Sequence, residues 1–300
     1  MPRATPGAQL LHDDALDELD ELAAALHAGL TSLDLPLRSL EVEFGPNQLE
    51  VTLGAGDARS AADEVVLCRA AIRQICRRAG YLATFLSRPA GARTVSTGWH
   101  LHQSLCDADD GRSLFGSWDP EQDSGLGYGV LSDLGGSYLA GLLAHAAAAA
   151  AFTTPTVNGY KRYQPQSLAP DRIVWGIDNR GAMVRVIGGP GTPATRLENR
   201  SGEPAANPYL YVASQLVCGL DGVDRSLDPG PPTEEPYLAG AKRLPRSLGE
   251  ALDALARDPL FGSALGEEVV AWYSALKRAE FERYLAHVSD WEQREYFALL

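Results

Sequence analysis

Leucines recur at helical spacing near the start of the chain. Between residues 13 and 30 (DDALDELDELAAALHAGL) they return every three or four positions, with acidic residues between them, and Gly29 suits the end of a helix. This stripe consists of Leu16, Leu19, Leu22, Leu26 and Leu30. More helices are expected at 59–79, at 134–152, from 207 to about 219 and over the last 50 residues. The run at 134–152 is rich in alanine, which permits close helix packing.

Shorter segments between these helices have the pattern of β-strands. SLEVEFGPNQLEVTL (39–53) predicts two strands around a Gly-Pro-Asn turn. Further strands are predicted in YLATFL (81–86), GWHLHQSL (98–105), DRIVWGI (171–177), MVRVIGG (183–189) and TRLENR (195–200). We expect residues 1–15 to be a loose start and 224–246, rich in Pro and Gly, to be a surface loop. Strands mixed irregularly with helices favour an α+β fold over a regular βαβ alternation.

Composition narrows the class of protein. A chain of 300 residues that is 45% hydrophobic can bury a sizeable core. A net charge of -13 argues against a nucleic-acid partner. No CxxC pair is present, so buried thiols in a reducing compartment are expected at Cys68, Cys76, Cys106 and Cys218. The absence of a long apolar run predicts a cytoplasmic protein with no membrane partner.

The segment TRLENR carries an unusual set of charges for a strand. Arg196, Glu198 and Arg200 are spaced by two and would project from one face. Burying two guanidinium groups and a carboxylate is costly unless they pair or hold a ligand. This strand is therefore a candidate for a binding site.

Two other strands carry candidate metal ligands. His100, His102 and Ser104 share one strand face in GWHLHQSL. Glu43 and Glu50 flank the predicted hairpin turn, where exposed glutamates are usually only solvated. One imidazole with several carboxylates suits Mg²⁺ or Mn²⁺ better than zinc.

Basic residues gather in the middle of the sequence. The guanidinium fork matches phosphate and carboxylate, so these residues predict anionic ligands, although each one alone could be an ordinary surface cation. They are Lys161, Arg162, Arg180 and Arg185. No P-loop and no G-x-G-x-x-G in a strand–helix context is present, so a nucleotide would be bound through metal and arginine.

Six segments occur in an order that identifies a family resemblance. They are EFGPNQLE, GWHLHQSL, NGYKRYQPQSLAP, IDNRGAMVR, RLENRSGEPAANPYLY and DWEQREYF. Together they resemble the catalytic domain of the glutamine synthetase family over about residues 20–300. The resemblance implies a single domain over 1–300 with a curved antiparallel sheet flanked by helices. It also implies a ligase that activates the γ-carboxylate of glutamate with ATP, through γ-glutamyl phosphate, and uses Mg²⁺ or Mn²⁺.

The same resemblance implies a role for each candidate residue. Metal ligands would be Glu43, Glu50, His100 and Glu198. Glutamate would be held by Arg162, Arg200 and the backbone at Gly98. Arg180 and Arg185 would face the transferred phosphoryl group, and Arg162 and Arg180 are the expected catalytic residues. The nucleotide would lie near His102, Ser104, Arg185 and Arg196.

The chain departs from the family pattern in two places. Family members carry an N-terminal β-grasp domain and an E-x-E strand that supplies further metal carboxylates, and this chain enters the pattern after both. We therefore expect a homo-oligomer or a partner chain that supplies the missing part. The alternative is a truncated, non-catalytic or partner-dependent relative that binds nucleotide or glutamate.

The second departure concerns the amine substrate. Where ammonia-using members place a glutamate before Ala-Pro, this chain has Leu168. A leucine cannot accept a proton from ammonium and makes the entrance apolar. Members with a similar GWHLHQSL segment join glutamate to organic amines, so an organic amine is expected rather than ammonia. A related phosphoryl-transfer activity, such as that of a guanidino kinase, lacks the matching cysteine near the site.

Overall fold

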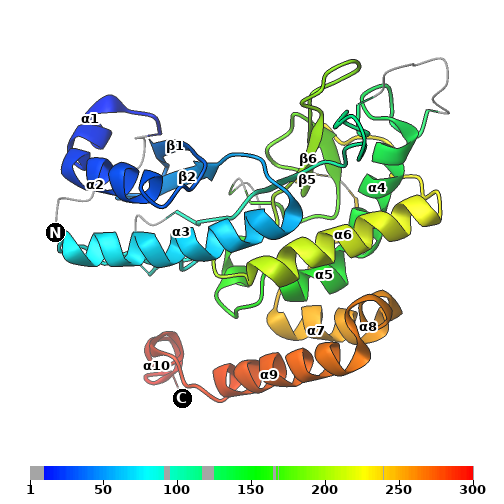
Figure 1. Cartoon of the computed structure of the whole chain (residues 1–300). Helices are drawn as coiled ribbons and strands as arrows, with labels where there is room; N and C mark the ends of the chain where they lie inside the picture. The colour runs from blue at the N-terminus through cyan, green and yellow to red at the C-terminus, as the bar shows by residue number, and fades with distance from the viewer. Residues whose placement is uncertain are drawn as a thin grey trace.

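The computed structural model describes residues 10–90, 95–116, 125–164, 167, 169–238 and 240–299. Its N-terminal layer consists of helices α1 and α2, the hairpin β1–β2 and the long helix α3 (Figure 1). These elements span α1 Asp13–Asp17, α2 Asp20–Thr31, β1 Leu37–Val42, β2 Leu49–Leu53 and α3 Ala58–Arg78. The predicted helix 13–30 is therefore interrupted after Asp17, yet its stripe still faces inward, with Leu26 and Leu30 fully buried.

A second sheet holds the strands of the candidate site. Its strand order is β3-β6-β5-β4. The strands span β3 Leu101–Gln103, β4 Trp175–Ile177, β5 Val184–Ile187 and β6 Arg196–Asn199. β6 pairs antiparallel with both β3 and β5, but β4 pairs parallel with β5. The expected wholly antiparallel sheet is corrected to a mixed one at this edge, where the chain turns through Asp178 at a positive φ of 48°.

Three helices form the centre of the molecule. They are α4 Asp133–Ala144, α5 Ala146–Thr153 and α6 Pro208–Asp224. The Ala-rich run was predicted as one helix, but it bends by 76° between α4 and α5. His145 lies at the bend, and its two ring nitrogens contact Asp221 of α6 and Asp258 at 2.8 and 2.6 Å. Among the described helices none is alone long and apolar enough to cross a membrane, and only this bent pair meets that test when combined.

Glycines set the distance between α4 and α6. A Cβ built on Gly141 would lie 2.0 Å from the carbonyl oxygen of Cys218, and one on Gly222 would lie 2.1 Å from that of Ser137. Such contacts are too short for any side chain, so the two backbones touch directly. Close packing was expected of this region, and glycine rather than alanine provides it at the tightest point.

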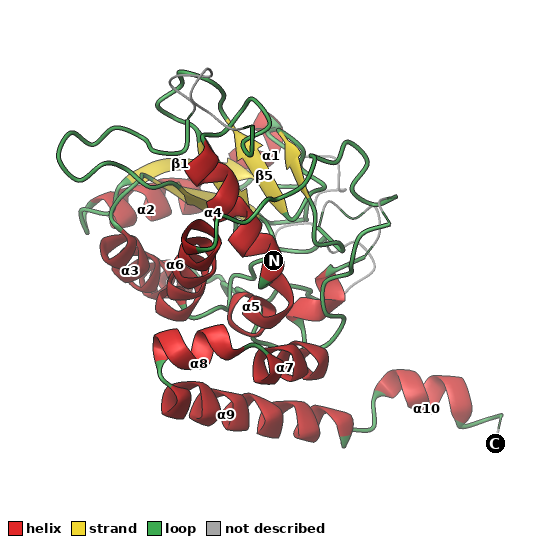
Figure 2. Ribbon diagram, turned by 90° about the vertical axis from the view of Figure 1, so that its right-hand side faces the viewer, coloured by secondary structure: helices red, strands yellow, loops and turns green. Residues whose placement is uncertain are grey.

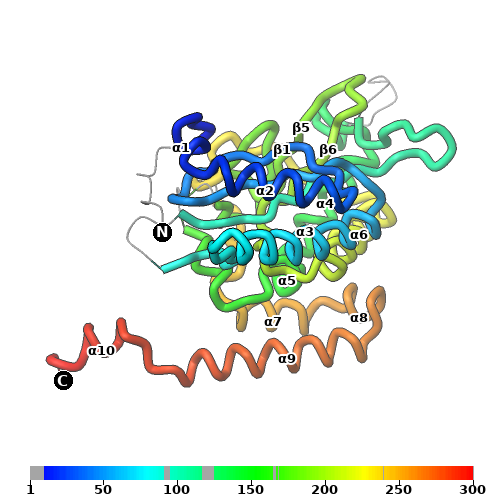
Figure 3. The backbone as a smooth tube through the Cα atoms, turned by 60° about the vertical axis from the view of Figure 1, so that its left-hand side comes forward, coloured from blue at the N-terminus to red at the C-terminus, as the bar shows by residue number. Residues whose placement is uncertain are grey.

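The C-terminal helices form a layer beneath this centre. They are α7 Leu248–Arg257, α8 Pro259–Leu265, α9 Glu267–Leu285 and α10 Asp290–Tyr296. In Figures 2 and 3 α9 runs below α7 and α8, and α10 projects away from the rest of the chain. Ahead of this layer, the short 3₁₀ helix η1 (Gly159–Arg162) leads into the segment before β4.

One predicted strand is absent from the structure, and another is shorter than predicted. YLATFL (81–86) forms no strand, because the N–H of Tyr81 bonds back to the carbonyl of Cys76 and closes the end of α3, and Leu82 is exposed. In GWHLHQSL only 101–103 pair as a strand. Cysteines at 68, 76 and 218 are buried as expected, whereas Cys106 is exposed.

Candidate active site

Three strands bring their charged residues into one row. In the register of the second sheet, Glu198 of β6 lies opposite His102 of β3 and opposite Arg185 of β5. Residues directly opposite each other project from the same face of a sheet. The row therefore runs His102, Glu198, Arg185 across β3, β6 and β5. The spacing in TRLENR predicted the position of Glu198 on this face.

Glu198 is the centre of this row. Its carboxylate is almost fully buried, and its Oε1 lies 2.6 Å from Nη1 of Arg200 and 3.2 Å from Nδ1 of His100. Its Oε2 accepts a hydrogen bond from Arg185 Nη1 at 3.1 Å. A buried carboxylate persists only when it is paired and hydrogen-bonded. Two arginines and a histidine meet that need.

The two histidines stay neutral beside these cations. Burial lowers the pKa of His100 well below its usual value, and Arg200 and Arg162 lower it further. Burial also lowers the pKa of His102, although Glu198 opposes the shift. Arg196 donates from Nε to Nδ1 of His102 at 3.1 Å, which requires an unprotonated Nδ1. Neutral imidazole is the form that binds metal ions.

The first hairpin brings a second pair of carboxylates together. Glu50 faces Glu41 in the register of β1 and β2, and its side chain hydrogen-bonds Glu43 at the turn. Burial raises the pKa of Glu50 to about 7, helped by the hydrogen bond and charge of Glu43 and by the charges of Glu41 and Glu198. Two carboxylates in one site cannot both ionise easily without a cation. The repulsion from Glu198 also indicates that hairpin and sheet contribute to one site.

The pairs Glu43–Glu50 and His100–Glu198 suit Mg²⁺ better than they suit a metal ion whose ligands all come from the protein. Mg²⁺ is commonly held by one or two carboxylates, with waters and substrate phosphates completing its shell. Glu43 with Glu50, and His100 with Glu198, are pairs of this kind. Within the described ranges no group of three or more His, Cys, Asp or Glu residues is close enough to hold a metal ion. Each pair alone therefore offers only part of a metal ion's coordination shell.

Arg162 is anchored by backbone carbonyls. It is buried, and its Nη1 donates to the carbonyls of Ser201 and Gly202, each at 3.0 Å, while Nη2 donates to that of Arg200 at 2.6 Å. A Cβ on Gly98 would lie 2.5 Å from Nη2 of Arg162, so only glycine allows this approach. The resemblance suggested close approach at Gly98, and the structure places Arg162 there.

Two predicted residues lie apart from these contacts. Ser104 is exposed and follows the end of β3. The Arg180 side chain is also exposed, and it is the backbone carbonyl of Arg180 that accepts a hydrogen bond from Arg200 Nε at 2.9 Å. Leu168, the residue behind the amine hypothesis, lies outside the described residues.

Two residues of the site were missed from the sequence. Asp178 accepts from Nε of Arg185 at 2.9 Å and so holds the guanidinium that reaches Glu198. Gln48 accepts from the N–H of Gly45 at 2.7 Å and donates to Thr97 at 2.9 Å, which ties the hairpin turn to the segment before β3. Asp178 stands in IDNR beside predicted site residues, and Gln48 lies between Glu43 and Glu50, so proximity in sequence was the available signal.

Comparisons of this chain with known proteins all indicate the same family. The family model for the catalytic domain of glutamine synthetase matches residues 2–296. A γ-glutamylanilide synthase from Acinetobacter is 47% identical over 307 aligned positions, covering 98% of this chain and 60% of the relative. A glutamine synthetase from Halobacterium salinarum is 36% identical, covering 89% of this chain and 59% of the relative.

A solved structure described as a GmaS/ADP complex matches with a TM-score of 0.88 and 31% identity. It covers 99% of this chain and 68% of its own. This chain spans about 60% of the length of the curated relatives that it matches. The agreement of fold, motif order and sequence over nearly the whole chain leads to one conclusion: the chain belongs to the glutamine synthetase family, within the region of its catalytic domain.

Proposed function

We propose that this chain is the catalytic region of an ATP-dependent ligase that joins the γ-carboxylate of glutamate to an amine. The observation that carries the proposal is Glu198, a buried carboxylate held by Arg185 and Arg200 beside His100. The pair Glu43–Glu50 adds its negative charge to the same region. A site with metal-binding oxygens and fixed guanidinium groups suits phosphoryl transfer, which depends on positioning and charge neutralisation.

Each group has a task in this reaction. A divalent ion, when bound, would neutralise phosphate charge as ATP is attacked, held by Glu43 and Glu50 or by His100 and Glu198. Arg185, oriented by Asp178, presents positive charge to the transferred phosphoryl group. Arg162 and Arg200 would orient the glutamate, and Arg180 would face the transferred phosphoryl group together with Arg185. The nucleotide would lie near His102, Ser104 and Arg196. The γ-carboxylate oxygen of glutamate attacks the terminal phosphorus of ATP, ADP leaves, and the amine then displaces phosphate from the γ-glutamyl phosphate.

We propose an organic amine rather than ammonia as the second substrate. Two observations support this choice. Leu168 stands where ammonia-using members have a proton-accepting glutamate. The relative that is 47% identical is named a γ-glutamylanilide synthase, which describes a product made with an arylamine. Turnover with ammonia equal to that with every alkyl- or arylamine tested would contradict this part of the proposal.

A second candidate is a relative that binds nucleotide or glutamate but completes its site only with another chain. It is favoured by the lack of any group of three metal-ligating side chains among the described residues. Under this candidate the further ligands come from a second copy or from a partner chain. Homo-oligomer formation and a cytoplasmic location stay predictions under both candidates.

Titration of Mg²⁺-ATP and Mn²⁺-ATP into the purified chain tests the site first. Binding should be lost in Glu198→Gln, which keeps the size of the side chain but removes its charge. It should persist in Glu268→Gln, a matched change at an exposed position of α9. Phosphate release with glutamate and a panel of ammonia, methylamine and aniline then separates the candidates. Nucleotide binding without turnover favours the partner-dependent relative, and no binding at millimolar nucleotide contradicts the first candidate, because the chain alone would then not be the enzyme.

A further inference from the structure

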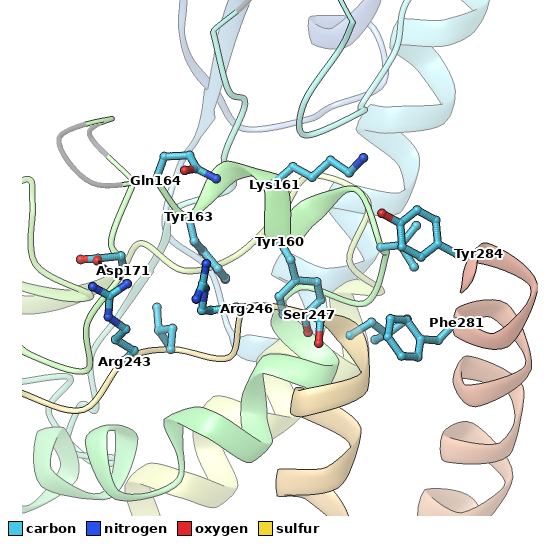
Figure 4. A pocket seen from close by; sticks show the side chains of 13 residues that line it. Tyr160, Lys161, Tyr163, Gln164, Asp171, Arg243, Arg246, Ser247, Phe281 and Tyr284 are labelled. Atoms are coloured by element: carbon cyan, nitrogen blue, oxygen red, sulfur yellow. Dashed lines mark ion pairs between the residues drawn. The ribbon is translucent and has the colours of Figure 1, made fainter. Parts of the chain in front are cut away.

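Arg162 is a buried cation, and among the described residues no carboxylate lies within ion-pair distance of it. Its neighbours Tyr160, Lys161 and Tyr163 line a cavity of about 220 Å³ beside η1 (Figure 4), but Arg162 does not line it. Its guanidinium instead donates to the backbone carbonyls of the loop that follows β6. The position of this guanidinium therefore depends on where the loop holds its carbonyls.

Glu203 lies at the end of this loop and is a buried acidic residue. Its side chain is 0% exposed, and within the described ranges no cation lies within ion-pair distance of it. Ser87 donates from Oγ to Oε2 of Glu203 at 2.8 Å. Thr156 donates twice, from its backbone N–H to Oε1 at 2.8 Å and from Oγ1 to Oε2 at 2.9 Å. Hydrogen bonds to both oxygens are what a buried carboxylate requires.

The contact with Thr156 connects Glu203 to the segment that carries Arg162. Thr156 precedes η1, and the N–H of Gly159, the first residue of η1, lies 3.2 Å from both the carbonyl oxygen and Oγ1 of Thr156. A Cβ on Gly159 would overlap Oε2 of Glu203, so a side chain at this position would displace the carboxylate. Glu203 thus packs directly against the start of the 3₁₀ helix that ends at Arg162.

The contact with Ser87 connects Glu203 to the segment that carries Gly98. The carbonyl of Ser87 accepts a hydrogen bond from the N–H of Thr97 at 2.8 Å, and Gly98 is the next residue. Gly98 is the residue whose lack of a side chain leaves room for the Arg162 guanidinium. Glu203 therefore joins three parts of the chain, which carry Arg162, make room for it and accept its hydrogen bonds.

Glu203 also supplies the negative charge that Arg162 lacks nearby. Burial lowers the pKa of Arg162, and the charge of Glu203 opposes that shift. Burial raises the pKa of Glu203, and its hydrogen bonds and the charge of Arg162 oppose that shift. Taking an unpaired charge out of water is costly, so each group stabilises the charged form of the other across the loop.

We propose that Glu203 is a positioning residue that fixes the Arg162 guanidinium for binding of the glutamate substrate. The inference rests on the proposed function, because it takes glutamate as the ligand of Arg162. A guanidinium has five N–H donors, and three of those on Arg162 bond to carbonyls of the loop. The other two meet no acceptor in the described part of the chain and can bind a carboxylate. Glu203 sets their direction by holding η1 and the loop together.

Calorimetric titration of glutamate and, separately, of Mg²⁺-ATP into the purified chain tests this role without relying on turnover. Glu203→Gln keeps the size of the side chain but removes its charge and one acceptor. It should weaken glutamate binding roughly tenfold or more and change the affinity for Mg²⁺-ATP less than about twofold, because only the glutamate side depends on Arg162. A general loss of structure would weaken both.

Thr156→Val is a second variant that keeps the charge of Glu203. It removes the Oγ1 donor while keeping the shape of the side chain, and glutamate binding should weaken about threefold. Thr156 is only half-buried, so this variant should fold even if Glu203→Gln does not. Asp221→Asn is the matched control, since it removes a partly buried carboxylate that bonds to His145 away from the candidate site. It should lower stability and leave glutamate affinity unchanged.

Failure of this inference and failure of the proposed function give different results. Arg162→Lys should weaken glutamate binding if the proposed function is correct. If it does so while Glu203→Gln and Thr156→Val do not, Glu203 is no positioning residue and the proposed function stands. Equal weakening by Asp221→Asn also overturns the inference, because the effect would then be one of stability alone. A parent chain that binds Mg²⁺-ATP but no glutamate contradicts the proposed function, and the inference with it.

Discussion

Glu43 and Glu50 share a hydrogen bond between their carboxyl groups at the turn of the first hairpin, and the pKa of Glu50 is about 7. Burial is the largest cause of the shift, and the charge of Glu43 adds to it. The pair holds its proton because a second negative charge at this place is unfavourable. Carboxyl groups with a pKa raised by burial and a neighbouring like charge are common at sites that bind a cation or a substrate.

The raised pKa of Glu50 predicts how stability depends on pH. The folded chain holds this proton up to about pH 7, whereas the unfolded chain releases it near pH 4.5, so the group reduces stability as pH rises through that window. Glu50→Gln should therefore be more stable than the parent at pH 8, by about 1 kcal/mol after allowing for solvent screening. The difference should vanish near pH 4. Thermal unfolding at both pH values measures it, and an equal difference at both would contradict the assignment.

Adding Mn²⁺ at pH 8 should stabilise the chain through the same pair. A cation bound by Glu43 and Glu50 removes their repulsion, and any ligand that binds only the folded state raises the melting temperature. At a concentration about a hundredfold above the dissociation constant the gain is about 2.7 kcal/mol. Glu50→Gln should lose most of this shift. Glu18→Gln, on an exposed surface turn, should retain it, and equal shifts in both variants would place the metal elsewhere.

His145 should be important for stability. It contacts Asp221 and Asp258 with its two ring nitrogens and so joins the α4–α5 bend to α6 and to the start of α8. Replacing it with Gln leaves two partly buried carboxylates without their shared partner, which should cost about 3 kcal/mol. Denaturant unfolding at pH 7 measures the loss. His27→Gln, at an exposed position of α2, is the matched control and should change little.

The contacts of His145 with Asp221 and Asp258 should also weaken in acid. Burial tends to raise the pKa of Asp221, but hydrogen bonds and charge from His145 and Arg225 outweigh it and lower the pKa below 3.8. This carboxylate contributes stability above that value, and the contribution is lost as pH falls through the lower folded pKa. The cost of His145→Gln should therefore shrink at pH 3. A cost that is unchanged at that pH would argue that the imidazole acts by packing alone.

Gly141 should tolerate no side chain. A Cβ at this position would lie 2.0 Å from the carbonyl oxygen of Cys218 and 2.8 Å from the backbone N of Gly222. Gly141→Ala must push α4 from α6, which should cost about 3 kcal/mol, the upper end of the usual range for overpacking. Gly56→Ala is the control, since a Cβ there meets nothing within 4 Å. Stability of the two variants by chemical denaturation checks the prediction, and equal stability would contradict the close packing.

The periodicity of apolar residues and the order of the motifs were enough to predict much of the fold. The leucine stripe of α2 and the alternation in TRLENR depend on neighbours three or two residues away, so local physics determined them. The shared face of Arg196, Glu198 and Arg200 followed, because side chains spaced by two project from the same side of a strand. The order of six motifs indicated the family, which the comparisons bear out.

The remaining features depend on contacts between residues that are far apart in the sequence. The bend in the Ala-rich run needs the carboxylates of Asp221 and Asp258, more than 70 residues beyond His145, and helix propensity alone favours no bend there. YLATFL has strand propensity but meets no partner strand, so it does not form a β-strand. The convergence of the hairpin carboxylates with Glu198 and the cavity beside η1 likewise arise only when distant segments pack. Sequence by itself determined which side chains share a face, and tertiary structure decided which faces meet, because long-range contacts form only where packing offsets the entropy of closing the loops between them.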